Sequence, residues 1–482
     1  MSGSTRVSCP STINSIMKKF LRTTGYGSLA VVILMMMAAT FIEKFKGTEA
    51  ALRIIYHNPV FMVLWGIAAV CFLWYFLSDG GAKKFFTLLL YIAFPIILLG
   101  ALITHLRGQD GEVRLDPGVT ESQWVMEDGS VRELPVPMTL EKFEIERYPG
   151  SQMPSDYRST ITVGTGQDSR TVVISMNKIG KIEGYRFYQS DFDGDSSILM
   201  VVRDPWGVGV TYAGYLLLLI GMLGFFFQKD NGFKRAVARL SEAGETGRRI
   251  SPKLILILRI AAGALLAYTT FVLGRSWVIS GHVPFVGGYA VMMVMAWMSA
   301  LAMVVLGKRF PVIFVPGFLL AFFTMLLAFR SGAASANTPL APVLRSPLLS
   351  VHVLSMMMSY TFLGLVALLG VTGLLKSGEE AGRNLMDLSL AILYPAVFLI
   401  AFGTFLGAVW ANISWGSYWA WDPKETWALI TLLVYAAALH GASVKVFRNP
   451  KLFHIYVFIA FICVLITYFG VNLVLGGMHS YS

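Results

Sequence analysis

Charged residues are scarce in this chain. Asp, Glu, Lys and Arg make up 14% of its 482 residues, whereas soluble domains hold roughly 25%. Hydrophobic residues make up 55% of the chain, and its mean hydropathy is +0.64. This composition excludes an ordinary soluble enzyme and predicts a membrane protein.

Cysteine is also nearly absent. The three cysteines are Cys9, Cys71 and Cys463, and none belongs to a CxxC or CxxCH motif. The chain therefore carries no thioredoxin-like dithiol and no covalent heme attachment site of its own. The polar residues 1–24 lack the pattern of a cleavable signal peptide, so the first apolar stretch is predicted to be a retained anchor.

Long apolar stretches dominate what is present. A spanning helix needs roughly 20 mostly apolar residues, and eleven stretches meet this requirement. They lie near 25–43, 58–78, 85–106, 207–228, 253–274, 287–307, 311–330, 348–375, 386–410, 425–446 and 455–477. The predicted fold class is an all-α polytopic membrane protein with about eleven transmembrane helices.

One long polar interval separates the third and fourth spans. It holds three runs rich in β-branched and aromatic residues, at 171–176, 184–189 and 197–202, which predict a small β-rich domain. The expected organisation is a tail at 1–24, three spans at 25–106, the β-rich domain at 107–206, a fourth span at 207–228, a basic polar linker at 229–252 and seven spans at 253–482.

The positive charge follows the topology. Basic residues gather in the loops after even-numbered spans, for example in 229–252 and at Lys308 and Arg309, while most loops after odd-numbered spans hold fewer. This pattern places the N-terminus in the cytoplasm and the β-rich domain, the 410–427 loop and the C-terminus outside. The net charge of +11 is thereby explained, and no nucleic-acid partner is expected.

Tryptophan is concentrated in one loop, WANISWGSYWAWDPKETW at 410–427, which we call the tryptophan loop. It contains five of the eleven tryptophans. Tryptophan favours the membrane–water interface, so a plain aromatic belt is the alternative interpretation. A belt, however, gives no reason to interleave Gly, Ser, Asp, Pro and Lys with the rings. We predict that Trp415, Trp419 and Trp421, with Tyr418 between them, form a flat platform for a large planar ligand.

Histidines supply candidate ligands for the iron of a heme on this platform. His352 begins the eighth span and His479 follows the eleventh, both at the level of the tryptophan loop. Two imidazoles are a standard way to hold six-coordinate heme iron. His440 lies inside the tenth predicted span, where an ionisable group is costly and indicates function. A structural role is the alternative for each of them, and His105 stays in reserve.

These residues resemble a known family. WGSYWAWDPKETWALI (415–430), followed by a histidine, is similar to the "WWD" segment of the CcsA/CcmC/CcmF heme-handling superfamily. Residues 346–362 and 470–481 resemble its two outer histidine regions. Residues 176–190 and 201–215 resemble the ResB partner subunit. Nearly the whole chain therefore resembles a CcsB–CcsA fusion, a single-chain cytochrome c synthase of a bacterial cytoplasmic (inner) membrane.

The resemblance implies roles for the loop. The residues that would contact heme b are Trp410, Trp415, Tyr418, Trp419, Trp421, Asp422 and Trp427. Those that would present its vinyl groups for attachment are Trp415, Trp419, Trp421 and Asp422.

The resemblance also implies two iron sites. His352 and His479 would ligate iron at the outer site, and His440 would be one of two ligands within the membrane. Tyr91 stands where the family has the second embedded histidine, at a depth that matches His440. Tyrosine can ligate ferric heme. Ala290 is a further departure, since the family has an acidic residue there.

The expected function is to deliver heme across the membrane and attach it to the reduced CxxCH thiols of apocytochrome c. Because this chain has no dithiol, a thioredoxin-like reductant is an expected partner beside membrane lipid. One alternative is a heme exporter or chaperone without attachment activity. A second is a b-type electron-transfer subunit, which would need paired histidines at both depths. A secondary transporter is a third, but its site would lie on broken helices at the midplane.

Overall fold

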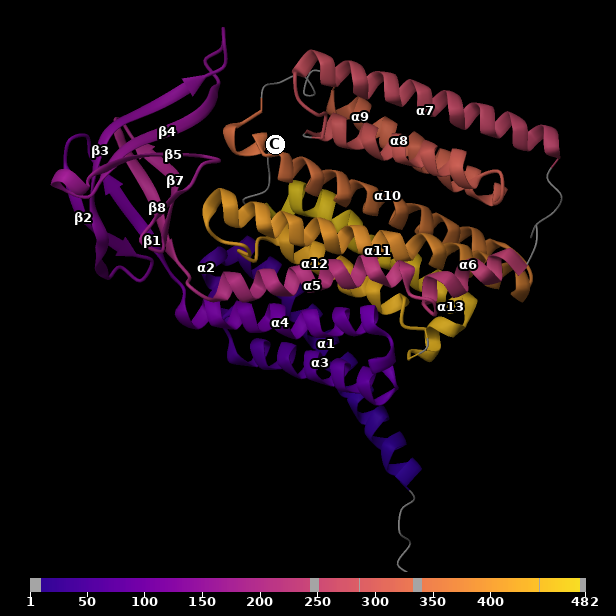
Figure 1. Cartoon of the computed structure of the whole chain (residues 1–482). Helices are drawn as coiled ribbons and strands as arrows, with labels where there is room; N and C mark the ends of the chain where they lie inside the picture. The colour runs from indigo at the N-terminus through magenta and orange to yellow at the C-terminus, as the bar shows by residue number, and fades with distance from the viewer. Residues whose placement is uncertain (1–9, 243–250, 286, 333–339, 442, 477–482) are drawn as a thin grey trace, which may run out of the picture.

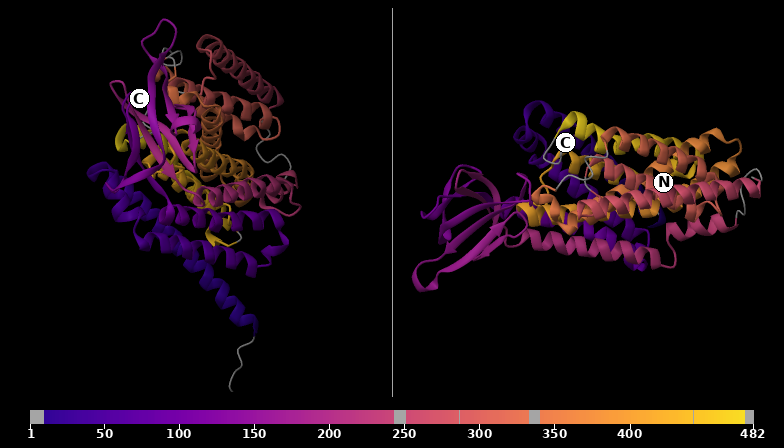
Figure 2. Two further views of the ribbon diagram at one scale, coloured as in Figure 1. Left: turned by 60° about the vertical axis from the view of Figure 1, so that its left-hand side comes forward. Right: turned by 90° about the horizontal axis from the view of Figure 1, so that it is seen from above.

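The computed structural model describes residues 10–242, 251–285, 287–332, 340–441 and 443–476. Long helices run side by side in one bundle, and a single β-sheet is attached at one end of it (Figure 1 and Figure 2). We call this end of the bundle the sheet end and the opposite end the far end.

The front part of the chain supplies four long helices: α1 (Pro10–Lys46), α3 (Pro59–Ser78), α4 (Phe85–Arg107) and α5 (Gly207–Phe227). Short helical turns connect the first three: α2 (Thr48–Ala51), η1 (Leu52–Tyr56) and η2 (Gly81–Lys83). Large apolar side chains such as Phe41, Trp74 and Leu99 are exposed on these helices. A helix that is apolar all round suits a lipid environment.

The rear part contains the remaining helices, α6 (Gly232–Glu242), α7 (Pro252–Ser280), α8 (Gly288–Leu306), α9 (Phe314–Ser331), α10 (Pro347–Leu375), α11 (Glu379–Trp415), α12 (Pro423–Ala438) and α13 (Pro450–Leu465). Short turns η4 (Pro311–Ile313), η6 (Pro342–Arg345) and η7 (Lys445–Arg448) lie between them, and α13 continues into the π-helix η8 (Ile466–Leu475). The rear part includes the largest buried apolar cluster, with α8, α10 and α11 contributing most of its residues.

Helix α11 runs along the bundle between its two ends. Its 37 residues reach about 55 Å at 1.5 Å per residue. Pro395 lies inside it and removes one backbone hydrogen bond from the helix. Near the far end, the buried Asp387 accepts hydrogen bonds from Arg239 of α6, with Nη2 at 2.5 Å and Nε at 2.9 Å. A buried carboxylate needs such a partner, so this ion pair fixes α6 to α11.

Ten helical segments among the described residues are long and apolar enough to cross a membrane. They correspond to ten of the eleven predicted stretches, which confirms the expected class of a mostly helical, polytopic membrane protein with one antiparallel sheet. The stretch 425–446 is the exception, because its helix α12 has 16 residues and ends at Ala438. The chain then turns back, with the N–H of Ser443 donating to the carbonyl of His440 at 2.8 Å.

The structure differs from the sequence predictions for His440 and for the linker 229–252. His440 lies in the turn that follows α12 and not inside a spanning helix. Part of the predicted polar linker 229–252 is the amphipathic helix α6, which buries Ala236 and Leu240 while its charged residues stay at the surface. Its eleven residues are too few for a span, so a search for long apolar stretches misses it.

The polar interval folds into one antiparallel sheet of eight strands in the order β5-β4-β3-β2-β1-β8-β7-β6. The strands are β1 (Gln109–Leu115), β2 (Thr120–Met126), β3 (Val131–Arg147), β4 (Pro154–Val163), β5 (Arg170–Ser175), β6 (Gly180–Ile182), β7 (Tyr185–Asp193) and β8 (Ser196–Arg203). The three predicted strands correspond to β5, β7 and β8, and the prediction of a β-rich domain is confirmed. The other five strands lack so compact a run of β-branched and aromatic residues, and β1 and β3 are rich in charged residues.

The sheet curls so that strands distant in its order face each other. Ser159 of β4 lies 2.6 Å from Gln189 Oε1 of β7 and 2.7 Å from Ser197 Oγ of β8, and all three are buried. Buried polar side chains are stable when they satisfy one another in this way. The apolar core enclosed by the curl includes Leu140 and Phe187.

Helices α4 and α5 flank the sheet in sequence and pack closely against each other. Gly207, Gly214 and Gly221 recur every seven residues on the α5 face toward α4. A Cβ at Gly214 would lie 2.6 Å from Ile97 Cγ1, and one at Gly221 would lie 2.8 Å from Leu90 Cδ2. Small residues allow this approach of backbones, which stabilises helix pairs in lipid.

We predict that Gly214→Ala destabilises the folded protein by about 1–3 kcal/mol, because the added methyl overpacks the α4–α5 contact. The control is Gly209→Ala on the same helix, where a Cβ meets nothing within 4 Å. Each variant is heated in detergent, and size-exclusion chromatography then measures the fraction of protein that remains monodisperse at each temperature. Equal thermal midpoints for the two variants would show that the close contact of α4 with α5 contributes nothing to stability.

Candidate functional site

The tryptophan loop begins where α11 meets the sheet. Gly416 ends α11 in the left-handed conformation, with φ 86°. A Cβ at this position would lie 2.7 Å from Val202 Cγ2 and 2.9 Å from Tyr188 Cε2, both on the sheet. Because only glycine combines this conformation with this close approach, Gly416 sets the start of the loop against the sheet.

Asn412, one turn before the end of α11, is held from two directions. Its backbone carbonyl accepts a hydrogen bond from Tyr188 Oη of β7 at 3.0 Å, and its Oδ1 accepts one from Arg186 at 3.3 Å. Its amide Nδ2 donates to Tyr212 Oη of α5 at 2.6 Å. The sheet and α5 thus fix the end of α11 together.

The second half of the loop is fixed by hydrogen bonds to α12. Asp422 is buried and caps α12, with Oδ1 accepting from the N–H of Lys424 at 2.8 Å. Glu425 Oε2 accepts from the N–H of Ala420 at 3.0 Å. Trp421 has φ 59°, a left-handed conformation that a bulky residue adopts only where its surroundings impose it.

The tryptophan side chains fall into an accessible and a buried group. Trp415, Trp419 and Trp421 are half-buried, whereas Trp410 and Trp427 are 2% and 1% exposed. Trp427 Nε1 donates to Thr40 of α1 at 3.3 Å. The three rings predicted as a platform are therefore more exposed than Trp410 and Trp427, which support them from inside the bundle.

The accessible rings do not form one flat surface. The ring planes of Trp419 and Trp421 meet at 85°, with centroids 5.8 Å apart. Tyr418 is buried, and its hydroxyl donates to Thr104 Oγ1 of α4 at 3.1 Å instead of lying between the rings. The expectation of a flat platform is wrong in this respect, because the left-handed turn at Trp421 rotates its ring away from that of Trp419.

The front part of the chain completes the aromatic site. Tyr56, at the end of η1, stacks on Trp421 with centroids 4.3 Å apart and planes at 14°. Its hydroxyl lies 3.2 Å from Thr426 Oγ1. Phe61 of α3 contacts Trp421 edge-on at 5.4 Å. Tyr56 could not be predicted from the sequence, since one tyrosine in an apolar segment gives no signal of its partner.

His352 lies in the second turn of α10 against α11. Its Nδ1 is 2.6 Å from the backbone carbonyl of Gly403, and a Cβ at Gly407 would lie 2.6 Å from the same nitrogen. A carbonyl can only accept, so Nδ1 carries the hydrogen and Nε2 has the lone pair that a metal needs. The start of α10 also packs against Trp410 and Trp415 through Leu349 and Val353, the neighbours of His352 on the same turns.

His479 lies outside the described residues. The chain that leads toward it is described as far as 476, and Asn472 of η8 accepts a hydrogen bond from Lys424 Nζ at 2.9 Å. Lys44 of α1 also donates to the backbone carbonyl of Val474. Helix η8 therefore packs beside the first turn of α12.

Tyr91 and His440 meet toward the far end of the bundle. Tyr91 Oη lies 3.2 Å from His440 Nε2. His440 Nδ1 is 2.8 Å from the carbonyl of Ala436, so the hydrogen is again on Nδ1 and Tyr91 donates to the lone pair of Nε2. The ring of Tyr91 stacks on Phe76, with centroids 4.2 Å apart and planes at 7°. The depth comparison thus predicted a contact that the structure contains.

This pair lines a cavity between the front and rear parts. The cavity has a volume of about 470 Å³, within the roughly 300–1,000 Å³ of ligand pockets. Its walls are mainly apolar and come from α1, α3, α4, α5, α11 and α12, with Phe72, Phe94 and Phe398 among them. Neither part of the chain encloses it alone.

Two further predicted positions lie outside these sites. Ala290 is buried in α8 among apolar neighbours. His105, near the sheet end of α4, lies beside His57 with ring centroids 4.9 Å apart. Neither lines the cavity.

Comparison with known proteins divides the chain in the same way. The model of the family described as "Cytochrome C assembly protein" matches residues 285–479, and that of the "ResB-like family" matches residues 78–201. The two matches fall in the rear and the front part, on opposite sides of the cavity.

Curated relatives point to the same family. Protein NrfI of Wolinella succinogenes is 35% identical over 213 residues, which is 42% of this chain and 24% of NrfI, so the match spans about a quarter of that protein. The cytochrome c biogenesis protein CcsA of Chlamydomonas reinhardtii is 34% identical, over 48% of this chain and 70% of CcsA.

A cyanobacterial relative is matched over nearly its whole length. CcsA of Synechococcus sp. (strain CC9605) is 30% identical over 311 residues, 56% of this chain and 95% of CcsA. The chain therefore belongs to the CcsA family of cytochrome c biogenesis proteins, joined in one polypeptide to a ResB-like part as in a CcsB–CcsA fusion.

Proposed function

We propose that this protein acts in cytochrome c maturation by binding heme b at the sheet end and attaching it to the reduced CxxCH thiols of an apocytochrome c. Its family supports the role in maturation. The observation that carries the finer proposal is the arrangement of Trp415, Trp419 and Trp421. They are the more exposed rings of the loop, and His352 stands on the part of α10 that packs against Trp410 and Trp415, with its Nδ1 held by the carbonyl of Gly403.

The loop suits a bound porphyrin in two ways. Its rings offer faces for the macrocycle, and the indole Nε1 of Trp419 is buried with no hydrogen-bond partner among the described residues. A buried donor without a partner is costly, so a ligand acceptor would satisfy it. His352 and His479 are the proposed axial ligands, and Asp422 acts by holding the loop on α12.

Attachment needs orientation more than proton chemistry. Each cysteine thiol of the CxxCH segment adds across one vinyl group, so that sulfur bonds to one vinyl carbon and a proton ends on the other. No oxidant is consumed. The thiolate is the better nucleophile, so the substrate cysteines must stay reduced, and a thioredoxin-like reductant outside this chain would keep them so.

The proposed topology follows the distribution of charge. The sheet end lies outside a bacterial cytoplasmic membrane, with the sheet beside the attachment site, and the N-terminus lies in the cytoplasm. The far end then faces the cytoplasm, where heme is made available. This orientation places the Tyr91–His440 cavity between the supply of heme and the site of attachment.

Heme in transit is proposed to occupy this cavity with Tyr91 and His440 as its ligands. The 3.2 Å contact between Tyr91 Oη and His440 Nε2 would open to admit the iron between the two atoms. A phenolate oxygen favours ferric iron. The cavity therefore supports delivery of heme together with attachment. An exporter or chaperone without attachment activity is the alternative that the first experiment separates.

The first prediction concerns attachment. Coexpression with a CxxCH apocytochrome, in a bacterial host without its own maturation system, should yield covalent heme on a denaturing gel. His352→Ala should lower the yield roughly tenfold or more, because an axial ligand is lost, and added imidazole should restore part of it. His282→Ala is the control, since its ring bonds the adjacent carbonyl of Val283. Holocytochrome at the wild-type level in His352→Ala would contradict the proposal.

The second prediction tests how His352 is positioned. Gly407→Ala should lower stability by no more than about 1–2 kcal/mol, because the preference of alanine for a helix, about 1 kcal/mol, offsets part of the cost of moving the imidazole off Gly403. Its Cβ would displace the imidazole, so heme binding at the sheet end should fall several-fold in titrations followed by absorbance. Gly263→Ala, where a Cβ meets nothing within 4 Å, is the matched control. Heme binding at the wild-type level in Gly407→Ala would show that the His352–Gly403 contact does not position His352 as an iron ligand.

The third prediction concerns the cavity. Tyr91→His should raise the reduction potential of bound heme and improve its retention in the ferrous state, because histidine replaces an oxygen ligand. Tyr91→Phe should lose ferric heme from the cavity. Tyr26→Phe changes another tyrosine of the cavity wall and should preserve binding. Potentiometric titration of the purified protein provides the measurement, and potentials that do not differ between wild type and Tyr91→His would exclude Tyr91 as a ligand.

A further inference from the structure

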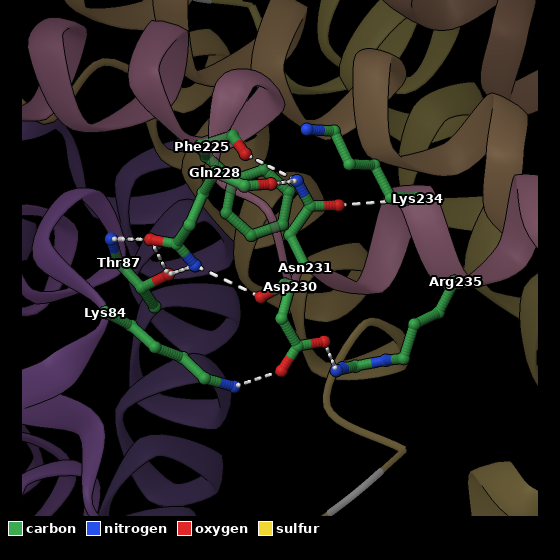
Figure 3. A network of polar contacts seen from close by, with 8 residues as sticks. All are labelled: Lys84, Thr87, Phe225, Gln228, Asp230, Asn231, Lys234 and Arg235. Atoms are coloured by element: carbon green, nitrogen blue, oxygen red, sulfur yellow. Dashed lines mark hydrogen bonds and ion pairs between the residues drawn. The ribbon is translucent and has the colours of Figure 1, made fainter.

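The far end of the cavity differs in chemistry from its apolar interior. Its lining there includes Lys84, Thr87, Asp230, Asn231 and Arg235. Figure 3 shows these side chains where the start of α4 meets the connection from α5 to α6. The cavity is thus a space with apolar walls that ends in a polar, charged mouth.

One carboxylate bridges two cations at this mouth. Asp230 lies 3.4 Å from Lys84 Nζ and 2.5 Å from Arg235 Nη1 (Figure 3). The side chains are 41%, 64% and 51% exposed for Lys84, Asp230 and Arg235. Pairs this exposed contribute little to stability, so a competing carboxylate can replace Asp230 at small cost. Two cations and one anion also leave one positive charge in excess.

The surrounding backbone is held by other side chains. Asn231 Nδ2 donates to the carbonyls of Phe225 and Gln228, at 2.6 and 3.0 Å, and Asn231 Oδ1 accepts from the N–H of Lys234 at 2.7 Å. Gln228 and Thr87 join the two segments, with Nε2 of Gln228 donating to Thr87 Oγ1 at 3.1 Å. These bonds are independent of the Asp230 carboxylate, so the backbone segments that carry the two cations stay in place if it moves away.

We propose that Lys84 and Arg235 form a binding site for the carboxylates of the ligand that fills the cavity, and that Asp230 occupies this site in the ligand's absence. The ligand class is a flat apolar molecule with two carboxylates on one edge, as in heme. Lys84 precedes Tyr91 by seven residues, about 10 Å along α4, which suits the distance from the iron of heme to its propionates. This inference rests on the proposed function of the Tyr91–His440 site.

The proposal predicts that removing either cation weakens heme binding and that removing the carboxylate strengthens it. Heme titration of the full chain in detergent measures both effects. His352→Ala serves as the common background, which removes a ligand of the sheet-end site. Lys84→Ala and Arg235→Ala should each weaken heme binding roughly three- to tenfold, because each removes a charge-assisted contact. Asp230→Asn should strengthen binding by a similar factor, since it removes the competing carboxylate.

Two matched controls change the same charge nearby without lining the cavity. Lys83→Ala alters the residue next to Lys84, and Lys234→Ala alters the residue next to Arg235. Both should bind heme as the background protein does. Heme dimethyl ester, whose propionates are neutral, should bind the background protein more weakly than heme and should not distinguish it from Lys84→Ala.

Each other outcome has a defined meaning. If Asp230→Asn weakens binding as Lys84→Ala does, the three residues only hold the helices together, and the proposal fails. It also fails if the ester binds as tightly as heme, because the carboxylates of heme would then contribute nothing to binding. Loss of heme in Tyr91→Phe and His440→Ala, with no effect of the mouth variants, overturns this inference alone. If Tyr91→Phe and His440→Ala retain heme, the proposed cavity site itself is wrong.

Discussion

The stack of Trp421 on Tyr56 and the contact of Tyr91 with His440 join the front and rear parts at two levels of the bundle. Each contact pairs one residue from the front part with one from the rear part. Both candidate sites therefore form only when the front and rear parts are correctly aligned along the bundle. The close packing of α4 on α5 fixes the front part internally, and the Arg239–Asp387 ion pair fixes α6 to α11 within the rear part. The hydrogen bond from Asn412 of α11 to Tyr212 of α5 joins the two parts directly.

The same kind of hydrogen bond orients a histidine at each site. In both His352 and His440, Nδ1 bonds a helix carbonyl and Nε2 is left as the nitrogen with a lone pair. The tautomer is set by the backbone and needs no carboxylate nearby, which avoids placing a charge in an apolar surrounding. Its cost is steric: Gly407 must lack a side chain for the imidazole of His352 to approach α11.

The sequence predicted most of what depends on composition and on residues close together in the chain. The spans, the β-rich domain and the accessible Trp415, Trp419 and Trp421 all follow from apolar runs or from one dense motif. The end of α12 was misplaced, because the apolar residues continue past Ala438 while the backbone turns. The sequence did not predict the roles of Tyr56, Gly407 or the Lys84–Asp230–Arg235 mouth. Each role depends on a partner from another helix, which the sequence alone does not identify. The pairing of Tyr91 with His440 could be predicted from sequence because the family resemblance marked both positions and their depths in the membrane agreed.

The proline inside α11 has a consequence for the wall of the cavity. Tyr394 and Phe398 lie beside Pro395 and line the cavity, whereas the same helix is held by the sheet at Asn412 and by α6 at Asp387. Pro395 removes one backbone hydrogen bond between these two fixed points. The stretch of α11 that a ligand in the cavity would contact is therefore the stretch that bends most easily, while both ends of the helix stay anchored.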